Sequence, residues 1–295
     1  MLPSVEQPEQ STGYQDAMRR SSRLRCGRFE LDLSQPKLMA IINTTPDSFS
    51  GDGLGGDLDR ALARALAAID AGAEILDIGG ESTRPGAEPV SEQQELDRVI
   101  PLVERLAGGT VPVSVDTLKP GVMREAIRAG ASMINDVNGF AAPGAVEAVV
   151  GSNTGLCVMH MRGQPSDMQH APSYHDVVTE VSAYLCGRVD ALAQAGVAAE
   201  RIVIDPGFGF GKTLTHNLQL LKHLIHLQPS RFPVLVGMSR KSMLGAVTGR
   251  SVDERLAAGI AAAMIAVSNG ARIVRVHDVA PVRDALAMWS AVHSV

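Results

Sequence analysis

AGAEILDIG, residues 71–79, contains the pattern from which the fold class is predicted. An alanine-rich run leads into it, Gly72 follows that run, and a short apolar segment comes next. Glycine commonly ends a helix because it accepts the left-handed backbone conformation. A short apolar run of this kind is typical of a strand that is buried on both faces. The stretch therefore predicts the end of a helix followed by a buried strand.

Three further stretches share this arrangement: AGASMINDV at 129–137, AGVAAERIVIDPG at 195–207 and NGARIVRVHDV at 269–279. Helical patterns, for example at 57–71, 92–106, 176–195 and 253–269, alternate with short apolar runs. The predicted strands are residues 38–42, 74–78, 111–115, 132–134, 155–159, 201–204, 233–236 and 272–276. Eight such units in about 260 residues predict an α/β fold of the (β/α)8 TIM-barrel type. A doubly wound open sheet is the alternative, because alternation alone does not show that the sheet closes.

The N-terminal region precedes this repeating part of the chain. Residues 1–24 are polar and predict a flexible, disordered tail, whereas 25–33 alternate enough to predict a short strand pair. Residues 25–295 are then expected to form one domain.

Composition limits the classes of function. The 295 residues are 45% hydrophobic and 3% aromatic, and the formal net charge is −5. An acidic chain is poorly suited to sequence-independent binding of nucleic acid or of an anionic membrane. An anionic ligand would need a local basic site.

The cysteines and the N-terminus indicate the compartment. The chain has three cysteines, Cys26, Cys157 and Cys186, an odd number without metal-ligand spacing, so reduced thiols are expected. The first residues lack the apolar run of a signal peptide. The most apolar stretch, 257–267, is far shorter than the ~20 residues that span a bilayer. We therefore expect a cytoplasmic protein that binds neither membrane nor nucleic acid.

The glycine-rich stretch DPGFGFGKT, residues 205–213, superficially resembles a nucleotide-binding loop. A P-loop needs four residues between its first glycine and its Gly-Lys pair, but only three separate Gly207 from Gly211. The dinucleotide pattern G-x-G-x-x-G also fails, because the glycines alternate. The stretch must therefore have another role.

Polar side chains follow nearly every predicted strand. Active sites of (β/α)8 barrels lie at the carboxyl ends of the strands, so these residues are the candidates for a site. They are Asn43, Thr83, Arg84, Asp116, Asn135, Asp136, Met159, His160, Asp205, Ser239, Arg240, Lys241, Arg275 and His277.

These candidates divide into two sets by their chemistry. Asn43, Arg84, Arg275 and His277 could hold a phosphate or pyrophosphate, and the side-chain oxygen of Asn43 could serve a Mg²⁺ ion. The second set is Asp116, Asn135, Asp205 and Lys241, which suits a flat heterocycle with an amino-amidine edge.

Other residues have simpler explanations. We expect Asp136 to cap a turn or helix, Cys157 to be a core residue, and Lys212 to be exposed or capping. Arg240 could equally be part of a structural ion pair, and His160 could be a satisfied core histidine. Met159 is interpreted as a wall of the site. The sequence shows no convincing Ser/His/Asp or Cys/His triad.

Eight motifs together resemble the dihydropteroate synthase family. They occur in the family's order over roughly residues 36–290 and are jointly specific, although each alone is weak. The motifs are INTTPDSFSGDG (42–53), DIGGESTRPGA (77–87), SVDT (114–117), INDVNG (134–139), MHMRG (159–163), DPGFGFGKT (205–213), SRKSMLG (239–245) and RVHDV (275–279).

The resemblance implies a pterin-binding TIM barrel of folate biosynthesis. Its members condense 6-hydroxymethyl-7,8-dihydropterin pyrophosphate with p-aminobenzoate to give 7,8-dihydropteroate and pyrophosphate. They use Mg²⁺, are homodimers, and are targets of sulfonamides, which compete with p-aminobenzoate. A pterin-dependent methyltransferase and a catalytically silent pterin-binding paralogue are the alternatives.

The resemblance also implies roles for residues at matching positions. Asp205, Lys241, Arg275 and His277 would carry the catalytic contacts, and Phe49, Thr83, Arg84 and Pro85 would lie in two mobile loops. The pterin set would be Asp116, Asn135, Met159, Asp205 and Lys241. The pyrophosphate set would be Asn43, Arg84, Arg275 and His277, with Asn43 as the metal ligand. The p-aminobenzoate set would be Phe49, Thr83, Arg84, Pro85, Phe210, Lys241 and Ser242.

The chemistry expected at this site is a dissociative substitution at the pterin methylene. A pyrophosphate leaving group and an electron-rich pterin need no strong general base, which agrees with the absence of a nucleophile–base dyad. Thr44, the order FSGDG and Arg162 depart from the commonest family pattern. These departures bear on drug sensitivity and loop dynamics more than on the reaction.

Overall fold

The structure is a computed structural model that describes residues 22–44, 53–82, 86, 88–164 and 167–294. Within these ranges it contains a closed barrel of eight parallel strands and a separate two-stranded antiparallel sheet. The antiparallel strands are β1 (Arg23–Cys26) and β2 (Phe29–Asp32). The barrel strands are β3 (Lys37–Asn43), β4 (Ile75–Gly79), β5 (Val113–Asp116), β6 (Met133–Asp136), β7 (Gly155–Met159), β8 (Ile202–Asp205), β9 (Val234–Val236) and β10 (Ala271–Val276).

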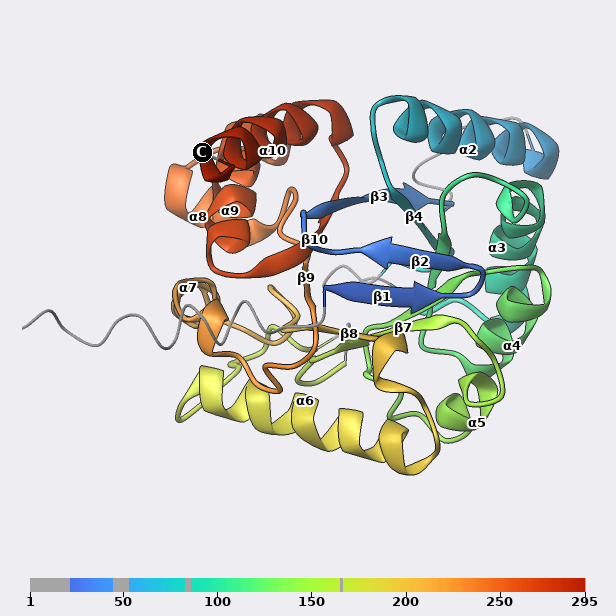
Figure 1. Cartoon of the computed structure of the whole chain (residues 1–295), viewed down its shortest axis with the longest axis horizontal. Coiled ribbons are helices and arrows are strands. Elements are labelled where there is room, and N and C mark those ends of the chain that lie inside the picture. The colour runs from blue at the N-terminus through green and yellow to red at the C-terminus, as the bar shows by residue number, and fades with distance from the viewer. Residues whose placement is uncertain (1–21, 45–52, 83–85, 87, 165–166, 295) are drawn as a thin grey trace, which may run out of the picture.

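Helices surround the barrel (Figure 1). The described helices are α2 (Gly53–Asp70), α3 (Glu92–Leu106), α4 (Pro120–Arg128), α5 (Ala145–Val149), α6 (Val177–Gln194), α7 (Leu214–Lys222), α8 (Ser242–Thr248), α9 (Leu256–Ser268) and α10 (Val279–His293). Each parallel strand is thus followed by helical chain that returns to the amino end of the next strand. This is the (β/α)8 arrangement that the repeat predicted, and it excludes the open sheet.

The barrel closes between its first and last strands. Arg275 of β10 lies in register with Met39 of β3, and β10 also pairs with β9. Most strands differ from their predicted bounds by one or two residues, and several extend further toward their carboxyl ends. The predicted helix 253–269 is in fact a 3-10 turn, Val252–Glu254, followed by α9.

The glycine of each repeat has the left-handed conformation that the sequence predicted. Gly72, Gly130, Gly196 and Gly270 have φ values of 99°, 102°, 95° and 96°. Each comes shortly after a helix and before a strand, so the chain reverses direction at the same point in each unit.

The strand pair closes the amino end of the barrel, where β1 and β2 lie across it in Figure 1. Leu24 and Cys26 are completely buried there. A Cβ atom on Gly155 of β7 would lie 2.8 Å from Cβ of Cys26, so the pair packs directly on the barrel. The pair begins at Arg23, two residues inside the expected tail, and the remainder of that tail lies outside the described residues.

None of the helices in the described part of the chain combines the length and apolarity needed to cross a membrane. Cys26, Cys157 and Cys186 are free thiols, and Cys157 is a core residue as predicted.

Candidate active site

The barrel interior is apolar at one end and polar at the other. Toward the amino end, a buried cluster joins barrel side chains to the strand pair through Leu24, Cys26, Leu33, Met39, Ile75, Met133, Cys157, Val203, Leu235 and Ile273. Two residues further along several strands, on the same face, the side chains become polar. They are Asp77, Ser114, Asn135, Asp205 and Arg275.

Strand register brings the predicted site residues together. Asn43 pairs with Gly79, Gly79 pairs with Asp116, and Asp116 pairs with Asn135. On the other side of the barrel, Met159 pairs with Asp205. The site residues from five strands therefore all lie at the carboxyl end of the barrel.

Arg275 joins the two predicted sets of residues. Its Nε donates to Oδ2 of Asp77 at 2.6 Å, and its Nη2 donates to Oδ2 of Asp116 at 2.8 Å. Burial alone would lower the pKa of Arg275, but the two carboxylates raise it above its ordinary value. The guanidinium is therefore a permanent positive charge between the predicted pterin and pyrophosphate residues.

Asp77 belongs to the site, although the sequence analysis did not select it. Its side chain is completely buried, and its Oδ2 also accepts from Nδ2 of Asn135 at 3.1 Å. The available signal was an acidic residue inside an apolar strand, where an unpaired charge is costly. Asp77 lies inside the predicted strand 74–78 and not at its end, so the search for polar residues at strand ends does not select it.

Three acceptor oxygens of this cluster lack a partner among the described residues: Oδ1 of Asp77, Oδ1 of Asp116 and Oδ1 of Asn135. Buried polar atoms in native proteins are nearly always hydrogen-bonded. Several unpartnered acceptors in one layer therefore match a ligand that presents N–H groups. This agrees with the amino-amidine edge inferred from the sequence.

Asp205 completes this layer from β8. It is 5% exposed, and its Oδ1 accepts from the N–H of Gly207 at 2.7 Å. Burial raises the pKa of Asp205, while Lys241 and the Gly207 N–H oppose that effect. Burial likewise raises the pKa of Asp116, with Arg275 opposing it.

Lys241 stands beside the DPGFGFGKT stretch. Its ammonium donates to the carbonyl oxygen of Phe208 and lies 4.7 Å from the ring centroid of Phe210. Burial lowers the pKa of Lys241 to about 8, although Asp205 acts in the opposite direction. Phe210 is buried in a small apolar cluster with Val137, Met159 and Met168, so Met159 is a wall residue as predicted.

The glycines of DPGFGFGKT allow close backbone contacts. Gly207 and Gly211 have φ values of 68° and 63°. A Cβ atom on Gly207 would lie 1.9 Å from the carbonyl oxygen of His160, and one on Gly211 would lie 2.2 Å from that of Arg162. The stretch is thus a tightly packed turn that carries Asp205 and Phe210 to the site.

The expectation that Lys212 is exposed or capping is wrong. Lys212 is 2% exposed, and its ammonium donates to the carbonyl oxygens of Gly207 at 2.9 Å and Phe210 at 3.0 Å. It also lies 2.9 Å from Nδ1 of His160. The left-handed glycines turn these carbonyls inward, where they need a donor, and Lys212 supplies it. Burial lowers the pKa of His160 to about 3, so its ring is neutral near pH 7.

The predicted pyrophosphate residues lie at the rim. His277 is half-buried, and its Nδ1 lies 3.1 Å from Oγ of Ser239. Asn43 is half-buried at the end of β3, and its Oδ1 would lie 3.8 Å from a Cβ atom on Gly79. Ser242 is exposed and is the first residue of α8.

Four predicted residues, Phe49, Thr83, Arg84 and Pro85, lie outside the described residues. Two other interpretations are confirmed. Asp136 caps the turn after β6 by accepting from the N–H groups of Asn138 and Phe140 at 2.8 and 2.7 Å. Arg240 is in an ion pair with Asp278 at 2.7 Å.

Comparison with known proteins identifies relatives of this site and fold. The model of a family described as pterin binding enzyme matches residues 39–277. A dihydropteroate synthase from Escherichia coli (strain K12) is 48% identical over 262 residues, which cover 88% of this chain and 93% of the relative.

Two solved structures show the same fold with ligands. Dihydropteroate synthase from Burkholderia cenocepacia, complexed with 7,8-dihydropteroate, is 54% identical with a TM-score of 0.85, covering 92% of this chain and 96% of that one. The enzyme from Xanthomonas albilineans, with 4-aminobenzoic acid, is 48% identical with a TM-score of 0.87, covering 93% and 99%.

Proposed function

Because the chain belongs to the family of pterin-binding enzymes, and within it to the dihydropteroate synthases, we propose that the polar end of its barrel binds both substrates of that reaction. The enzyme joins 6-hydroxymethyl-7,8-dihydropterin pyrophosphate to p-aminobenzoate and releases 7,8-dihydropteroate and pyrophosphate. The names of the relatives favour this reaction over that of a pterin-dependent methyltransferase.

We assign the pterin-binding residues from the buried acceptor oxygens that have no partner among the described residues. The pterin lies against Asp116, Asn135 and Asp205, with Met159 as a wall and Lys241 donating to a ring oxygen or nitrogen. Asp77 joins this set because it has the same unpartnered acceptor and shares Arg275 with Asp116. A carboxylate can accept two parallel hydrogen bonds from the amino-amidine edge of a pterin. A hydrocarbon ring has no N–H groups to donate, so these buried oxygens favour a pterin as the ligand.

The leaving group lies at the rim of the barrel. Arg275, His277 and Arg84 would hold the pyrophosphate, and the fixed charge of Arg275 stabilises the negative charge that develops as the C–O bond breaks. The pterin ring disperses the positive charge left on the methylene, so substitution is dissociative. The aniline nitrogen of p-aminobenzoate is uncharged at neutral pH and attacks without a strong base.

The second substrate is placed near Phe210, Lys241 and Ser242. The position of Ser242 at the start of α8 suits contact with a carboxylate. Phe49, Thr83, Arg84 and Pro85 would complete this site. Sulfonamides resemble p-aminobenzoate and are expected to compete for it.

A magnesium ion fits the donors at the rim. No cluster of three His, Cys, Asp or Glu side chains with metal-ligand geometry is found in the described ranges. Mg²⁺ is commonly held by one or two protein oxygens together with substrate phosphates, and Asn43 offers such an oxygen. When bound, the ion would help neutralise the departing pyrophosphate.

A homodimer is supported by the distribution of exposed apolar side chains. Of nine large exposed hydrophobic residues in the described part of the chain, eight lie on or between helices α7 to α10. These helices adjoin one another on one side of the barrel (Figure 1). The eight residues are Leu214, Leu218, Val247, Val252, Leu256, Ile265, Met288 and Val292.

The predicted cytoplasmic location stays a prediction.

The decisive experiment is an assay of pyrophosphate release from the dihydropterin pyrophosphate with Mg²⁺, with and without p-aminobenzoate. We expect release that depends on p-aminobenzoate and yields dihydropteroate. Asp205→Asn should lower kcat/KM by about 100-fold, because an amide N–H₂ then faces the pterin donors. Asp190→Asn, at an exposed position of α6, is the matched control and should leave the rate unchanged.

Other results would redirect the assignment. Pterin binding without any release of pyrophosphate would point to the silent paralogue. Near-normal turnover by Asp205→Asn would mean that Asp205 does not accept hydrogen bonds from the amino-amidine edge of the pterin.

A further inference from the structure

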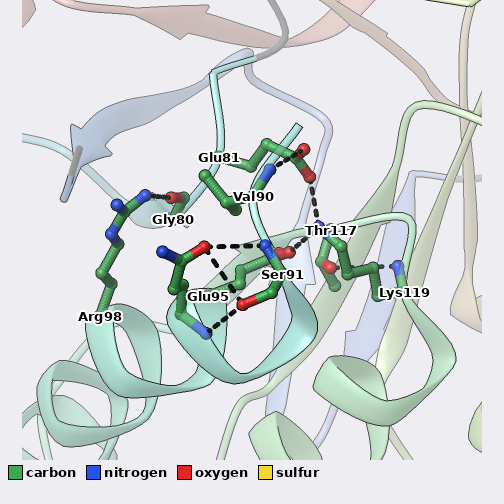
Figure 2. Close-up of polar contacts among 9 residues, drawn as sticks. Gly80, Glu81, Val90, Ser91, Glu95, Arg98, Thr117 and Lys119 are labelled. Atoms are coloured by element: carbon green, nitrogen blue, oxygen red, sulfur yellow. Dashed lines mark hydrogen bonds and ion pairs between the residues drawn. The ribbon is translucent and has the colours of Figure 1, made fainter. Parts of the chain in front are cut away.

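A cluster of three charged side chains, shown in Figure 2, is not used by the substrate contacts proposed above. The ammonium of Lys119 is 2.5 Å from Oε2 of Glu81 and 2.6 Å from Oε2 of Glu95. The side chain of Glu95 is completely buried, whereas those of Glu81 and Lys119 are 15% and 18% exposed. We call these residues the Glu81–Lys119–Glu95 cluster.

Glu81 connects the two ends of one segment of chain. Its other oxygen, Oε1, accepts from the N–H of Val90 at 3.1 Å (Figure 2). A single carboxylate therefore joins the chain at residue 81 to the chain nine residues later. Residues 82–89 lie between these two points in the sequence.

Both ends of the segment are also attached to α3. Nη1 of Arg98 donates to the carbonyl oxygen of Gly80 at 2.9 Å. A Cβ atom on Gly80 would lie 2.7 Å from Val99, so the backbone packs tightly against the helix there. At the other end, Ser91 is the N-cap of α3 and forms a capping box with Gln94.

Lys119 links this arrangement to the pterin strand. It follows Asp116 by three residues, and its N–H donates to Oγ1 of Thr117 at 3.2 Å. The N–H of Thr117 donates to the carbonyl oxygen of Asn135 at 3.0 Å. The backbone that carries Lys119 is thus attached to the strands that carry Asp116 and Asn135.

Stability alone does not account for Glu81. A fully buried carboxylate such as Glu95 needs a cation, and Lys119 provides one. Glu81 is a second acid on the same lysine and is not needed to neutralise Glu95. Its distinctive contact is the one to Val90, which determines how the two ends of the segment lie.

We propose that Glu81 is a positioning residue for the second substrate: together with Lys119 it holds residues 81 and 90, which flank segment 82–89 in the sequence, at fixed points. The proposal rests on the proposed function, in which Thr83, Arg84 and Pro85 of this segment serve p-aminobenzoate. The cluster contacts neither substrate. Through Lys119 it connects Glu81 and Val90, which flank these residues in the sequence, to the loop that follows Asp116.

The test is Glu81→Ala, which removes the connection but leaves the buried Lys119–Glu95 pair in place. Glu74→Ala is the matched control at the opposite end of the barrel. Glu74 also accepts from a lysine, Lys37 at 2.8 Å, and from a backbone N–H, that of Leu38 at 3.4 Å. Both Michaelis constants, kcat and the exchange rate of the Val90 amide are measured for each variant.

We expect Glu81→Ala to raise KM for p-aminobenzoate by about tenfold, in line with the loss of charge-assisted hydrogen bonds. KM for the dihydropterin pyrophosphate should change by less than about twofold. The Val90 amide should exchange faster than in Glu74→Ala, whose kinetics should match the wild type. Glu81→Gln keeps an acceptor oxygen and should recover most of the affinity.

Two results would overturn the inference alone: an unchanged KM for p-aminobenzoate in Glu81→Ala, or an equal rise of both Michaelis constants. The second result would indicate general destabilisation. A wild-type chain whose pyrophosphate release ignores p-aminobenzoate would instead overturn the proposed function, and this inference with it.

Discussion

Lys241 is a single residue whose pKa is changed by burial in the proposed site. Its ammonium is enclosed near Asp205, Arg275 and Asp116, and burial lowers its pKa to about 8. In the proposed complex the charged ammonium donates to the pterin, and it is a stronger donor than the neutral amine that remains after deprotonation. Its protonation therefore changes within the range in which the enzyme can be studied.

This predicts a pH dependence of ligand binding. Affinity for 7,8-dihydropteroate should fall by up to about tenfold per pH unit above pH 8, as Lys241 loses its proton. Titration calorimetry between pH 6.5 and 9.5 measures this. Lys241→Arg should abolish the fall, because a guanidinium keeps its charge throughout that range. A wild-type affinity that stays constant to pH 9.5 would contradict the assignment.

Among the structural elements, the turn DPGFGFGKT has the most restrictive requirements on backbone conformation and packing. Gly207 has a left-handed φ and lies against the carbonyl oxygen of His160, where a Cβ atom has no room. Lys212 then satisfies the carbonyl oxygens of Gly207 and Phe210 from inside the turn. The element is therefore rigid because of packing and buried hydrogen bonds.

Gly207→Ala should lower the free energy of unfolding by about 3 kcal/mol, from the left-handed backbone and the steric overlap together. Urea denaturation measures the change. Gly187→Ala is the control, since Gly187 lies exposed within α6 and a Cβ atom there would meet nothing within 4 Å. That change should raise stability by about 0.5–1 kcal/mol. Equal effects of the two variants would show that the turn tolerates a side chain.

At the scale of the whole molecule, the large exposed apolar residues are concentrated on one face of the barrel. The face formed by α7 to α10 carries nearly all of the large exposed apolar residues of the described chain. Apolar patches of this kind commonly mark contacts between subunits, and symmetric dimers are the commonest assemblies. The ninth such residue, Leu66, lies on α2, outside this face.

The double variant Val247→Glu with Met288→Glu should therefore convert the proposed homodimer to a monomer. The wild type should have twice the 31.1 kDa mass of one chain by light scattering, and the variant should have that mass once. Leu66→Glu on α2 is the control and should remain dimeric. A monomeric wild type would refute the homodimer.

Much of the fold was predictable because it is encoded locally. The four repeated glycines predicted the ends of helices, and all four have the left-handed conformation. Asp116, Asn135 and Asp205 were recognisable as polar residues at the ends of apolar strands. Asp77 and Lys212 were not, because their roles depend on partners distant in sequence, such as Arg275 and His160.

The sequence by itself determined the alternation of strands and helices, the points where the chain reverses and the family of its motifs, because each depends on neighbouring residues. The tertiary structure alone decided that β3 pairs with β10, that Arg275 lies between Asp77 and Asp116, and that Lys212 is buried. Periodicity does not specify which distant strands pair. Only when the sheet closes do the side chains of all eight strands share one interior, and only there do burial and neighbouring charge shift the pKa values on which the site depends.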